Sequence, residues 1–406
     1  MQTLVATFIA LLMCSNFILT SVPPNNSDTA QQDQLHAASS RFAFKLYNQI
    51  LKQRTTGNTF VSPASVMLAL TMTYNGADGT TREAMARTME LEGMSLDDVN
   101  RSFAELKSAL NPSDEKIQLK IANSLWARKG FTLNPAFVKR NKDSFEAEVN
   151  SLDFADTAAS QTINSWVNKN TEGKIEKIVD EINADAVLFL INAIYFKGQW
   201  QVEFKKEKTA PDMFRLSGTE RKEVPMMSQS GDYFYYKGKD FQSVALPYGK
   251  GSVSMYIFLP DEQTGLDQFE RSLTSENWET WMKSFQVTPG DLKLPRFKVE
   301  WEATLNETLK ALGMRDAFDP QRANFSQMAD VSAGNNLYIS EVKHKSWAEV
   351  NEEGTVAAAV TSVGMFVTSV QQPRQRFDMK VDRPFFFAIR DNQTGVVLFM
   401  GSVVNP

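Results

Sequence analysis

A long apolar run near the middle of the chain constrains the fold more than any other feature. Residues 186–200 carry a single charge, Lys197, and are rich in Leu, Ile, Phe and Tyr. A strand with one face in water alternates polar and apolar side chains, whereas a strand covered on both faces is apolar throughout. The run therefore predicts a strand at the centre of a sheet, with other elements packed on both of its faces.

Helical patterns dominate the first part of the chain. Apolar residues recur at helical spacing in residues 33–52. Ser62-Pro63 is typical of an N-cap followed by a first-turn proline, and a further helical pattern follows Asn134-Pro135. These segments predict helices that precede the central strand.

Strand patterns dominate the second part, from Ser228 onward. Short alternating segments are separated there by turn signals at 231–232, 249–251 and 260–261. Residues 384–389 and 396–400 predict two apolar strands joined by a polar turn. Helices first and mostly strands later indicate an α+β fold.

The composition allows one large core. Of the 406 residues, 42% are apolar, with 28 Phe and 7 Trp, and no linker or repeat divides the chain after the first 35 residues. The net charge of −5 gives no overall attraction for nucleic acid. A small basic cluster at Lys139, Arg140 and Lys142 is more typical of a solvated helix face than of a polyanion site.

The N-terminus resembles a signal peptide. Residues 4–19 are largely apolar, and Asp28 is the first charged residue. We expect residues 1–21 to be removed and residues 22–406 to form one secreted, extracellular domain without membrane attachment; a retained membrane anchor is the alternative. The only cysteine, Cys14, lies in this leader, where lipid attachment is a second alternative, so the mature chain would have no disulfide.

Few residues are available for catalysis. The chain has two histidines, His36 and His344, and no motif of a serine hydrolase, a zinc protease or a phosphate-binding loop. We therefore expect no catalytic residues, no metal site and no cofactor. An enzyme that uses a pair of carboxylates stays open, because the separation of Asp and Glu side chains in space is unknown at this stage.

Residues 352–361 have an unusual composition. Two glutamates and a glycine precede a run of alanine, valine and threonine. Small and β-branched side chains fit into a packed sheet with little steric cost, and Gly354 can act as a pivot. The segment is typical of a strand that is held outside a sheet and enters it later.

These segments together resemble the serpin family over residues 35–406. Besides the segment from Glu352, the matching motifs are Phe-Val-Ser-Pro-Ala-Ser at 60–65, Asn-Ala-Ile-Tyr-Phe-Lys-Gly-Gln-Trp at 192–200, Asp-Arg-Pro-Phe at 382–385 and Phe-Met-Gly at 399–401. The resemblance implies a serpin fold, with about nine helices around three β-sheets. It also implies an exposed reactive-centre loop at about 352–383.

The resemblance implies a function as well. Serpins present this loop to a serine protease, and the cleaved loop inserts into the largest sheet as a new strand, which traps the covalent acyl-enzyme. The protein expected is a monomeric suicide inhibitor whose partner is a serine protease. A non-inhibitory serpin that acts as a carrier or chaperone is the alternative.

Family position assigns the hinge of the loop to nine residues: Glu352, Glu353, Gly354, Thr355, Val356, Ala357, Ala358, Ala359 and Thr361. In an extended strand Thr355, Ala357, Ala359, Thr361 and Val363 would share one face. All five are small or β-branched, so this face can enter a tight core.

Family spacing places the scissile bond between Thr368 and Ser369, fourteen residues after Gly354. The β-branched Thr368 fits a shallow, elastase-like pocket best. Alternative positions are Phe366, Val367, Arg374 and Arg376. The first two keep a chymotrypsin-like target open, whereas cleavage after an arginine would suit a trypsin-like enzyme but would leave a longer, slacker tether.

The resemblance assigns two regions that gate insertion. The shutter, beneath the strands that must separate, contains Ser62, Ser65, Asn192 and His344. The breach, where the loop enters first, contains Trp200, Arg296 and Glu352, and pairing of Arg296 with Glu352 would restrain opening. His344 would be structural, because a buried imidazole needs partners for both nitrogens.

Five asparagines begin an N-x-[ST] motif: Asn25, Asn100, Asn306, Asn324 and Asn392. Such motifs accept N-glycans only in a chain that enters a glycosylating secretory pathway. Matches this short also arise by chance.

Overall fold

Nine α-helices lie in the part of the chain that the computed structural model describes, residues 26–54, 56–109, 114–216, 218–330, 336–355 and 375–406. They are α1 (Asn26–Leu51), α2 (Pro63–Tyr74), α3 (Gly79–Thr88), α4 (Leu96–Ala109), α5 (Pro135–Phe145), α6 (Ala159–Asn170), α7 (Gly265–Arg271), α8 (Ser275–Met282) and α9 (Asn306–Leu309). The helices predicted from residues 33–52, from Ser62-Pro63 and from Asn134-Pro135 are confirmed as α1, α2 and α5.

The first sheet has six strands, and its centre is the strand predicted from the apolar run. Its order is β10 (Phe297–Thr304), β11 (Glu341–Val350), β12 (Gly354–Thr355), β4 (Leu188–Gln199), β2 (Ile117–Arg128) and β3 (Glu148–Leu152). Neighbours flank β4 on both sides, and nine of its residues in succession are buried. The prediction for this run is therefore confirmed.

The other strands form a continuous hydrogen-bonded path. Its order is β1 (Thr59–Val61), β15 (Val397–Val403), β14 (Phe385–Asp391), β8 (Val253–Pro260), β7 (Phe241–Tyr248), β6 (Arg221–Lys237), β9 (Gln286–Pro295) and β13 (Phe377–Lys380), with β5 (Ala210–Arg215) also paired to β6. β6 and β9 are long enough to be shared by two groups of strands. One group pairs through β7 and the other through β5 and β13, so this nine-stranded sheet has two parts that share β6 and β9. Helices and sheets together give the expected α+β fold.

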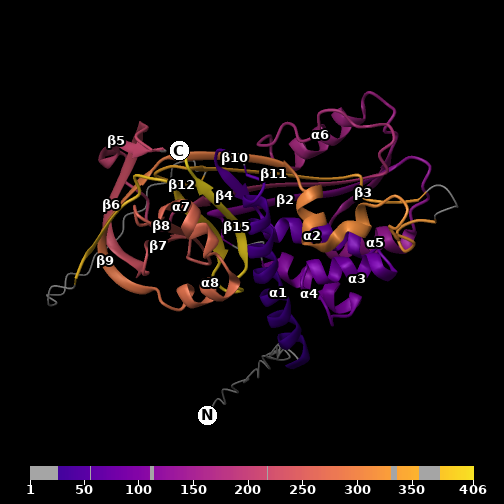
Figure 1. Ribbon diagram of the computed structural model, residues 1–406, viewed down its shortest axis with the longest axis horizontal. Helices are drawn as coiled ribbons and strands as arrows, with labels where there is room; N and C mark the ends of the chain where they lie inside the picture. The colour runs from indigo at the N-terminus through magenta and orange to yellow at the C-terminus, as the bar shows by residue number, and fades with distance from the viewer. Residues whose placement is uncertain (1–25, 55, 110–113, 217, 331–335, 356–374) are drawn as a thin grey trace, which may run out of the picture.

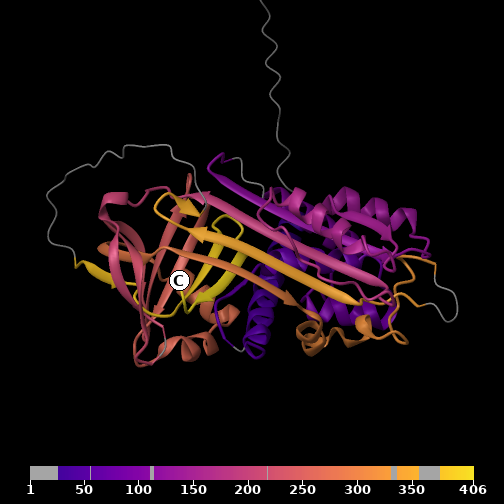
Figure 2. The same ribbon diagram turned by 90° about the horizontal axis from the view of Figure 1, so that it is seen from above.

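Helices cover both faces of the six-stranded sheet (Figure 1). α2 is buried along its whole length beneath one face, where it contacts β4 and β2. α6 lies on the opposite face, and its Ile163 and Val167 pack with Phe189, Tyr195 and Trp347 of the sheet in a smaller second core. Seen from above, the strands of this sheet run along most of the molecule's length (Figure 2). A strand that entered the sheet beside β11 would therefore be covered on its inward face, whereas on the outward face of β11 Glu341, Lys343, Lys345 and Glu349 are only partly buried.

The turn predicted at 231–232 is wrong. Gly231 lies inside β6, opposite Gly290 of β9, in an unbroken register from Met226 to Tyr235. The φ angle of Gly231 is not positive, so no turn is formed there. Ten consecutive cross-strand pairs outweigh the local turn preference of a Gly-Asp dipeptide. The turn predicted at 249–251 does connect β7 to β8, and the final hairpin is formed by β14 and β15.

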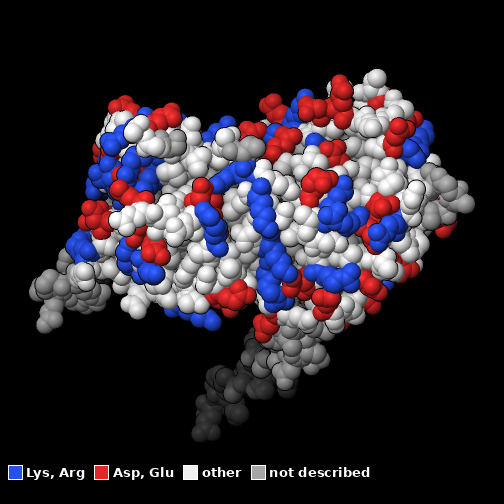
Figure 3. All heavy atoms as spheres, in the orientation of Figure 1, with Lys and Arg blue, Asp and Glu red and all other residues white. Residues whose placement is uncertain are grey.

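Charged side chains of both signs are spread over the face shown in Figure 3. The basic cluster lies on α5, where Lys139 and Lys142 are exposed and Lys139 pairs with Asp143 one turn later. This is the arrangement of a solvated helix face. Within the described ranges no helix is both long and apolar enough to cross a membrane. The expected leader, residues 1–21 with Cys14, lies outside the described residues.

Candidate functional site

The candidate site is the seam between β4 and β11. The two strands pair in parallel from Phe189 opposite Glu341 to Tyr195 opposite Trp347. Beyond that point the short strand β12 lies between them, and Thr355 pairs with Gly198 of β4 and with Val350 of β11. The sheet is therefore closed along most of the seam and already separated at one end.

A row of polar side chains crosses the closed part of the seam. His344 of β11 lies opposite Asn192 of β4, which lies opposite Asn123 of β2. His344 and Asn192 are fully buried, and Nδ1 of His344 is hydrogen-bonded to Oδ1 of Asn192 across the seam. Nδ2 of Asn192 donates in turn to Oδ1 of Asn123. We call these three residues the polar row.

The shutter serines connect the polar row to the start of α2. The backbone N–H of Ser62 donates to Nε2 of His344 at 3.3 Å, so Nδ1 carries the ring proton and is the donor to Asn192. Nδ2 of Asn192 also donates to Oγ of Ser65 at 2.5 Å. The hydroxyl of Ser62 donates to the carbonyl of Leu398 at 2.6 Å and caps α2 by accepting from the N–H of Ser65. All four shutter residues named from the sequence thus lie in one cluster.

His344 is a neutral, structural residue in this cluster. Burial lowers its pKa from 6.5 to about 3. Both ring nitrogens have hydrogen-bond partners, so neither is free to take a proton from a substrate. The arrangement holds strands together and carries no acid–base group of useful pKa.

Two breach residues, Arg296 and Glu352, form an ion pair at the other end of the seam. We call this pair the breach lock. Arg296 donates to both carboxylate oxygens of Glu352, over distances of 2.6–2.9 Å, and the Thr209 hydroxyl donates to the same carboxylate at 2.5 Å. The Glu352 side chain is 3% exposed and that of Arg296 is 44% exposed. Burial opposes ionisation of Glu352, but these hydrogen bonds outweigh it and lower the pKa of the carboxyl.

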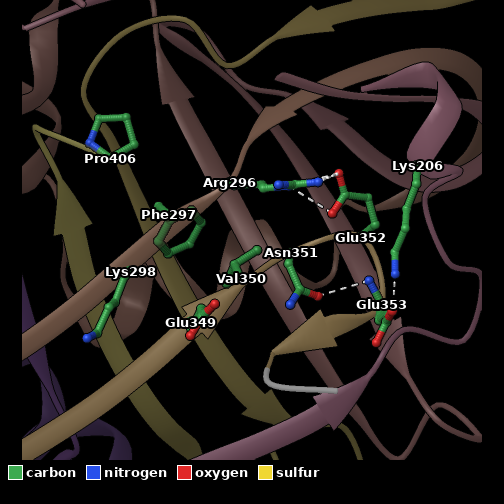
Figure 4. A pocket seen from close by; sticks show the side chains of 10 residues that line it. All are labelled: Lys206, Arg296, Phe297, Lys298, Glu349, Val350, Asn351, Glu352, Glu353 and Pro406. Atoms are coloured by element: carbon green, nitrogen blue, oxygen red, sulfur yellow. Dashed lines mark hydrogen bonds and ion pairs between the residues drawn. The ribbon is translucent and has the colours of Figure 1, made fainter. Parts of the chain in front are cut away.

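A charged cavity of about 490 Å³ lies beside this lock (Figure 4). Arg296 and Glu352 point toward each other at one side of it, and Lys206 reaches Glu353 at another. Asn351 accepts from the N–H groups of Glu353 and Gly354, which fixes the turn between β11 and β12. The two glutamates are therefore held in place from both sides.

Trp200, the residue directly after β4, anchors the same turn. Its ring stacks on Tyr248 with centroids 4.4 Å apart, and its Nε1 donates to the carbonyl of Asn351 at 2.9 Å. The backbone N–H groups of Trp200 and Phe204 donate to the carbonyls of Glu353 and Glu352, each at 2.9 Å. The indole is 2% exposed, so it packs as a core side chain and also fixes the hinge.

Gly354 and Thr355 show how the chain enters the sheet. Gly354 has φ +146°, and a Cβ there would lie 2.0 Å from the carbonyl oxygen of Gly198, so only glycine fits. Thr355 is completely buried, and its hydroxyl is 2.7 Å from that of Tyr248. Its side chain therefore points into the core beneath the sheet.

Several residues that complete the site were missed from the sequence. They are Asn123, Thr209, Tyr248 and Asn351. Only Asn123 had a local signal, because it is a polar residue among the buried positions of β2. The other three acquire their role through partners more than 100 residues away or through the conformation of one turn.

Most residues of the proposed loop lie outside the described part of the chain. Val356, Ala357, Ala358, Ala359, Thr361, Phe366, Val367, Thr368, Ser369 and Arg374 lie outside the described residues. Arg376 is described, and it pairs with Asp291 of β9. Within the described ranges no group of three or more His, Cys, Asp or Glu side chains could hold a metal ion.

Comparison with known proteins gives consistent matches over most of the chain. A family model described as Serpin (serine protease inhibitor) matches residues 37–406. Leukocyte elastase inhibitor A of Rattus norvegicus is 37% identical over 386 residues, which cover 92% of this chain and 100% of that protein. The native structure of tengpin, a thermophilic serpin, is 34% identical with a TM-score of 0.84, covering 91% of this chain and 94% of that one. Human thyroxine-binding globulin is 28% identical with a TM-score of 0.84, covering 93% and 99%.

The buried imidazole predicts a dependence of stability on pH. Because the unfolded chain binds a proton at His344 below pH 6.5 and the folded chain does not until about pH 3, stability falls as the pH drops below 6.5, by about 1.4 kcal/mol per pH unit. His344→Gln keeps a hydrogen-bonding side chain but removes the titration. We expect the loss of unfolding free energy between pH 7.5 and pH 5.0 to be about 2 kcal/mol smaller in this variant.

Urea unfolding at the two pH values checks this difference. His36 and Glu270 also have shifted pKa values, but both are present in the two proteins and cancel in the comparison. Equal pH dependence in wild type and variant would contradict the assignment of His344 as a neutral buried residue.

Proposed function

This chain belongs to the serpin family, and we propose that it is a secreted, monomeric inhibitor that traps serine proteases by inserting its own cleaved loop into the six-stranded sheet. The observation that carries the proposal is β12. Gly354 and Thr355, the first hinge residues that can enter a sheet, already lie between β4 and β11. The remaining loop follows directly from the point at which the seam is open.

The chemistry belongs to the protease. Its active-site serine attacks the carbonyl carbon of the residue before the scissile bond, Thr368 in this proposal. The peptide bond to Ser369 breaks, an ester to the protease forms, and a proton goes to the new amine of Ser369. Insertion of the loop then moves the protease before water hydrolyses the ester.

The register of β12 supports full insertion. If the strand continues in the register of Thr355, Thr361 comes opposite both Asn192 and His344, on the inward face that Thr355 occupies. Its hydroxyl can then replace the hydrogen bond that the polar row loses when the seam opens. The other inward residues of the hinge are Ala357 and Ala359, which need little space.

The same register supports a scissile bond near Thr368. In that register Met365 comes opposite Leu188, the first residue of β4. Thr368 would lie three residues beyond the sheet, on a tether of about 10 Å. Cleavage after Arg374 or Arg376 would add six or eight residues to the tether, which weakens the pull on the protease.

An elastase-like target is the specificity we favour. The β-branched Thr368 suits a shallow pocket, and a relative 37% identical to this chain is named leukocyte elastase inhibitor A. Phe366 and Val367 leave chymotrypsin-like enzymes as the next choice.

A carrier function is the competing proposal. Thyroxine-binding globulin, a similar fold at 28% identity, is named for the ligand it binds. A carrier needs no cleavage of the loop and no covalent complex, so the two proposals differ in what a protease does to the protein.

A protease panel tests the proposed function. We expect incubation with an elastase-like enzyme to give an SDS-resistant complex and a released C-terminal peptide that begins at Ser369. Chymotrypsin-like and trypsin-like enzymes serve as comparisons. Cleavage of the loop without any complex would favour the carrier, and a peptide that begins at another residue would relocate the scissile bond.

Thr355→Arg tests the start of insertion, because we expect the guanidinium to hold Gly354 and Thr355 out of the seam that they occupy in the native structure, so that the loop could insert only by burying the charge. A guanidinium in place of the buried Thr355 side chain would have no partner, and an unpaired buried charge costs about 3–5 kcal/mol. If about 1.4 kcal/mol of this cost is already present in the transition state, insertion becomes about tenfold slower. We expect the variant to be cleaved and released as a substrate, whereas Thr355→Ser keeps the hydroxyl and should form the complex as wild type does. The ratio of complex to cleaved inhibitor on a denaturing gel measures the effect.

Glu352→Lys tests the breach lock. It places a cation beside Arg296 where a carboxylate now accepts its hydrogen bonds, so we expect earlier opening and faster formation of polymers on mild heating. Glu349→Lys is the matched control, because it makes the same change of charge at the wall of the same cavity. Size-exclusion chromatography after heating measures the polymer fraction. Equal rates for Glu352→Lys and wild type would show that the pair does not restrain opening.

A further inference from the structure

The N-x-[ST] motifs are the sequence feature that the proposed function leaves unused. Four of their asparagines have described side chains, and these side chains differ in what Nδ2 contacts. An N-glycan is attached at Nδ2 and replaces one of its two hydrogens. The side-chain amide then becomes a secondary amide, and secondary amides prefer the trans form. In that form the sugar lies opposite Cβ across the Cγ–Nδ2 bond, on the same side as Oδ1. An acceptor compatible with the fold needs that side of Nδ2 to face open space.

Asn100 does not meet this requirement. It is 6% exposed, and its Nδ2 donates both hydrogens, to Oδ1 of Asn75 and to the carbonyl of Leu96. Asn75 donates back to Oδ1 of Asn100, so the two amides form a reciprocal pair between the end of α2 and α4. A sugar on Asn100 would separate these helices.

Asn392 does not meet the requirement either, because both hydrogens of its Nδ2 are donated within the fold. Its Nδ2 donates to the carbonyl of Gly251 and to Oγ of Ser254, and its Oδ1 accepts from the hydroxyl of Tyr256. The amide thus joins the turn after β14 to β8 and to the turn before it. No hydrogen of Nδ2 is left for exchange with a sugar.

Asn306 bridges two backbone groups at the start of β11. Its Nδ2 donates to the carbonyl of Ser340, and its Oδ1 accepts from the N–H of Val342. Because both bonds go to one short stretch of backbone, the Oδ1 side of the amide faces the chain. That is the side on which a trans-linked sugar would have to stand.

Asn324 has the opposite environment. It is exposed, its Oδ1 accepts from the N–H of Ser326, and in the described part of the chain Nδ2 has no hydrogen-bond partner. Gly79 lies beside the amide, where even an added Cβ would make only an ordinary van der Waals contact, 3.5 Å from Nδ2. Phe325 is 1% exposed and fixes the loop from within the core.

The backbone around Asn324 presents this side chain rigidly. Its carbonyl accepts from the N–H of Asp78, and its N–H donates to the hydroxyl of Thr81, so the loop is tied to the start of α3. α3 lies toward the end of the molecule away from β12 (Figure 1). A glycan at this position would stand clear of the hinge.

We infer that Asn324 is the N-glycan acceptor of the folded domain and that Asn100, Asn306 and Asn392 stay unmodified. The inference depends on the proposed secretion, because only a chain in the secretory pathway meets the glycosylating enzyme. Asn25 lies outside the described residues and is resolved by the experiment.

The experiment uses the full chain secreted from cultured insect cells. One arm keeps the chain's own N-terminus, and a second arm adds a heterologous signal peptide, so that export and acceptor choice are tested separately. Release of glycans by a peptide N-glycosidase in ¹⁸O water converts each occupied Asn to labelled Asp, and mass spectrometry of tryptic peptides locates the label. We expect the label at 324 and none at 100, 306 or 392.

Variants give an independent readout. Asn324→Gln and Ser326→Ala should each remove one glycosidase-sensitive step from the mobility of the secreted protein, whereas Ser326→Thr keeps the motif and should keep the step. Asn25→Gln identifies any step that comes from the N-terminal motif. Folded, secreted protein without label at 324, or with label at 100, 306 or 392, overturns the inference.

Failure of the proposed function is distinguishable from these outcomes. Protein made in bacteria carries no N-glycan, and its complex with the protease panel reports inhibition alone. Label at 324 only in the second arm supports the acceptor assignment and contradicts secretion by the chain's own N-terminus.

Discussion

The hydrogen bond between His344 and Asn192 is the interaction on which the closed state of the sheet depends. It joins β11 to β4 across the seam, and both side chains are fully buried. If the seam opened with nothing between the strands, both polar groups would lose a partner inside the core, where an unsatisfied group costs about 1–3 kcal/mol. In the proposed mechanism the strands would stay together until a third strand supplied a replacement, and continuation of the register of β12 would bring the hydroxyl of Thr361 to this position.

The backbone explains why insertion would be favourable. The closed seam is a parallel pair, and parallel pairing is slightly less stable per residue than antiparallel pairing. β12 pairs antiparallel with both neighbours, so each further residue would replace one parallel contact with two antiparallel ones. The core beneath the sheet, which includes the fully buried α2, would cover the inward face of the new strand from water. On the proposed mechanism, the native sheet would thus be one strand short of its most stable arrangement.

The sequence predicted those strands and helices of the site that depend on a local residue pattern. The apolar run gave β4, and Ser62-Pro63 gave the start of α2. The strand held in reserve, which the small residues after Gly354 indicated, lies beyond Thr355 outside the described residues and stays a prediction. The pairing of Arg296 with Glu352 came from family resemblance, because no spacing rule brings residues 56 positions apart together. Tyr248 carried no signal, since its partner Thr355 is 107 residues away. The false turn at Gly231 has the same cause, because only the pairing with β9 keeps that residue extended.

The Arg296–Glu352 pair and the polar row differ in their exposure to water, and an incoming strand would meet them one after the other. In the Arg296–Glu352 pair the guanidinium is partly exposed and the carboxylate is buried, so salt partly screens their attraction, whereas the polar row is buried and uncharged. The pair lies at the end where β12 stands, and in the register of β12 an inserting strand would meet the row six residues after Thr355. In the proposed mechanism, five residues beyond Thr355 would then already have gained antiparallel partners on both sides. The more costly interaction would be met only after insertion had become favourable, so the proposal assigns the start of the process to the salt-sensitive pair.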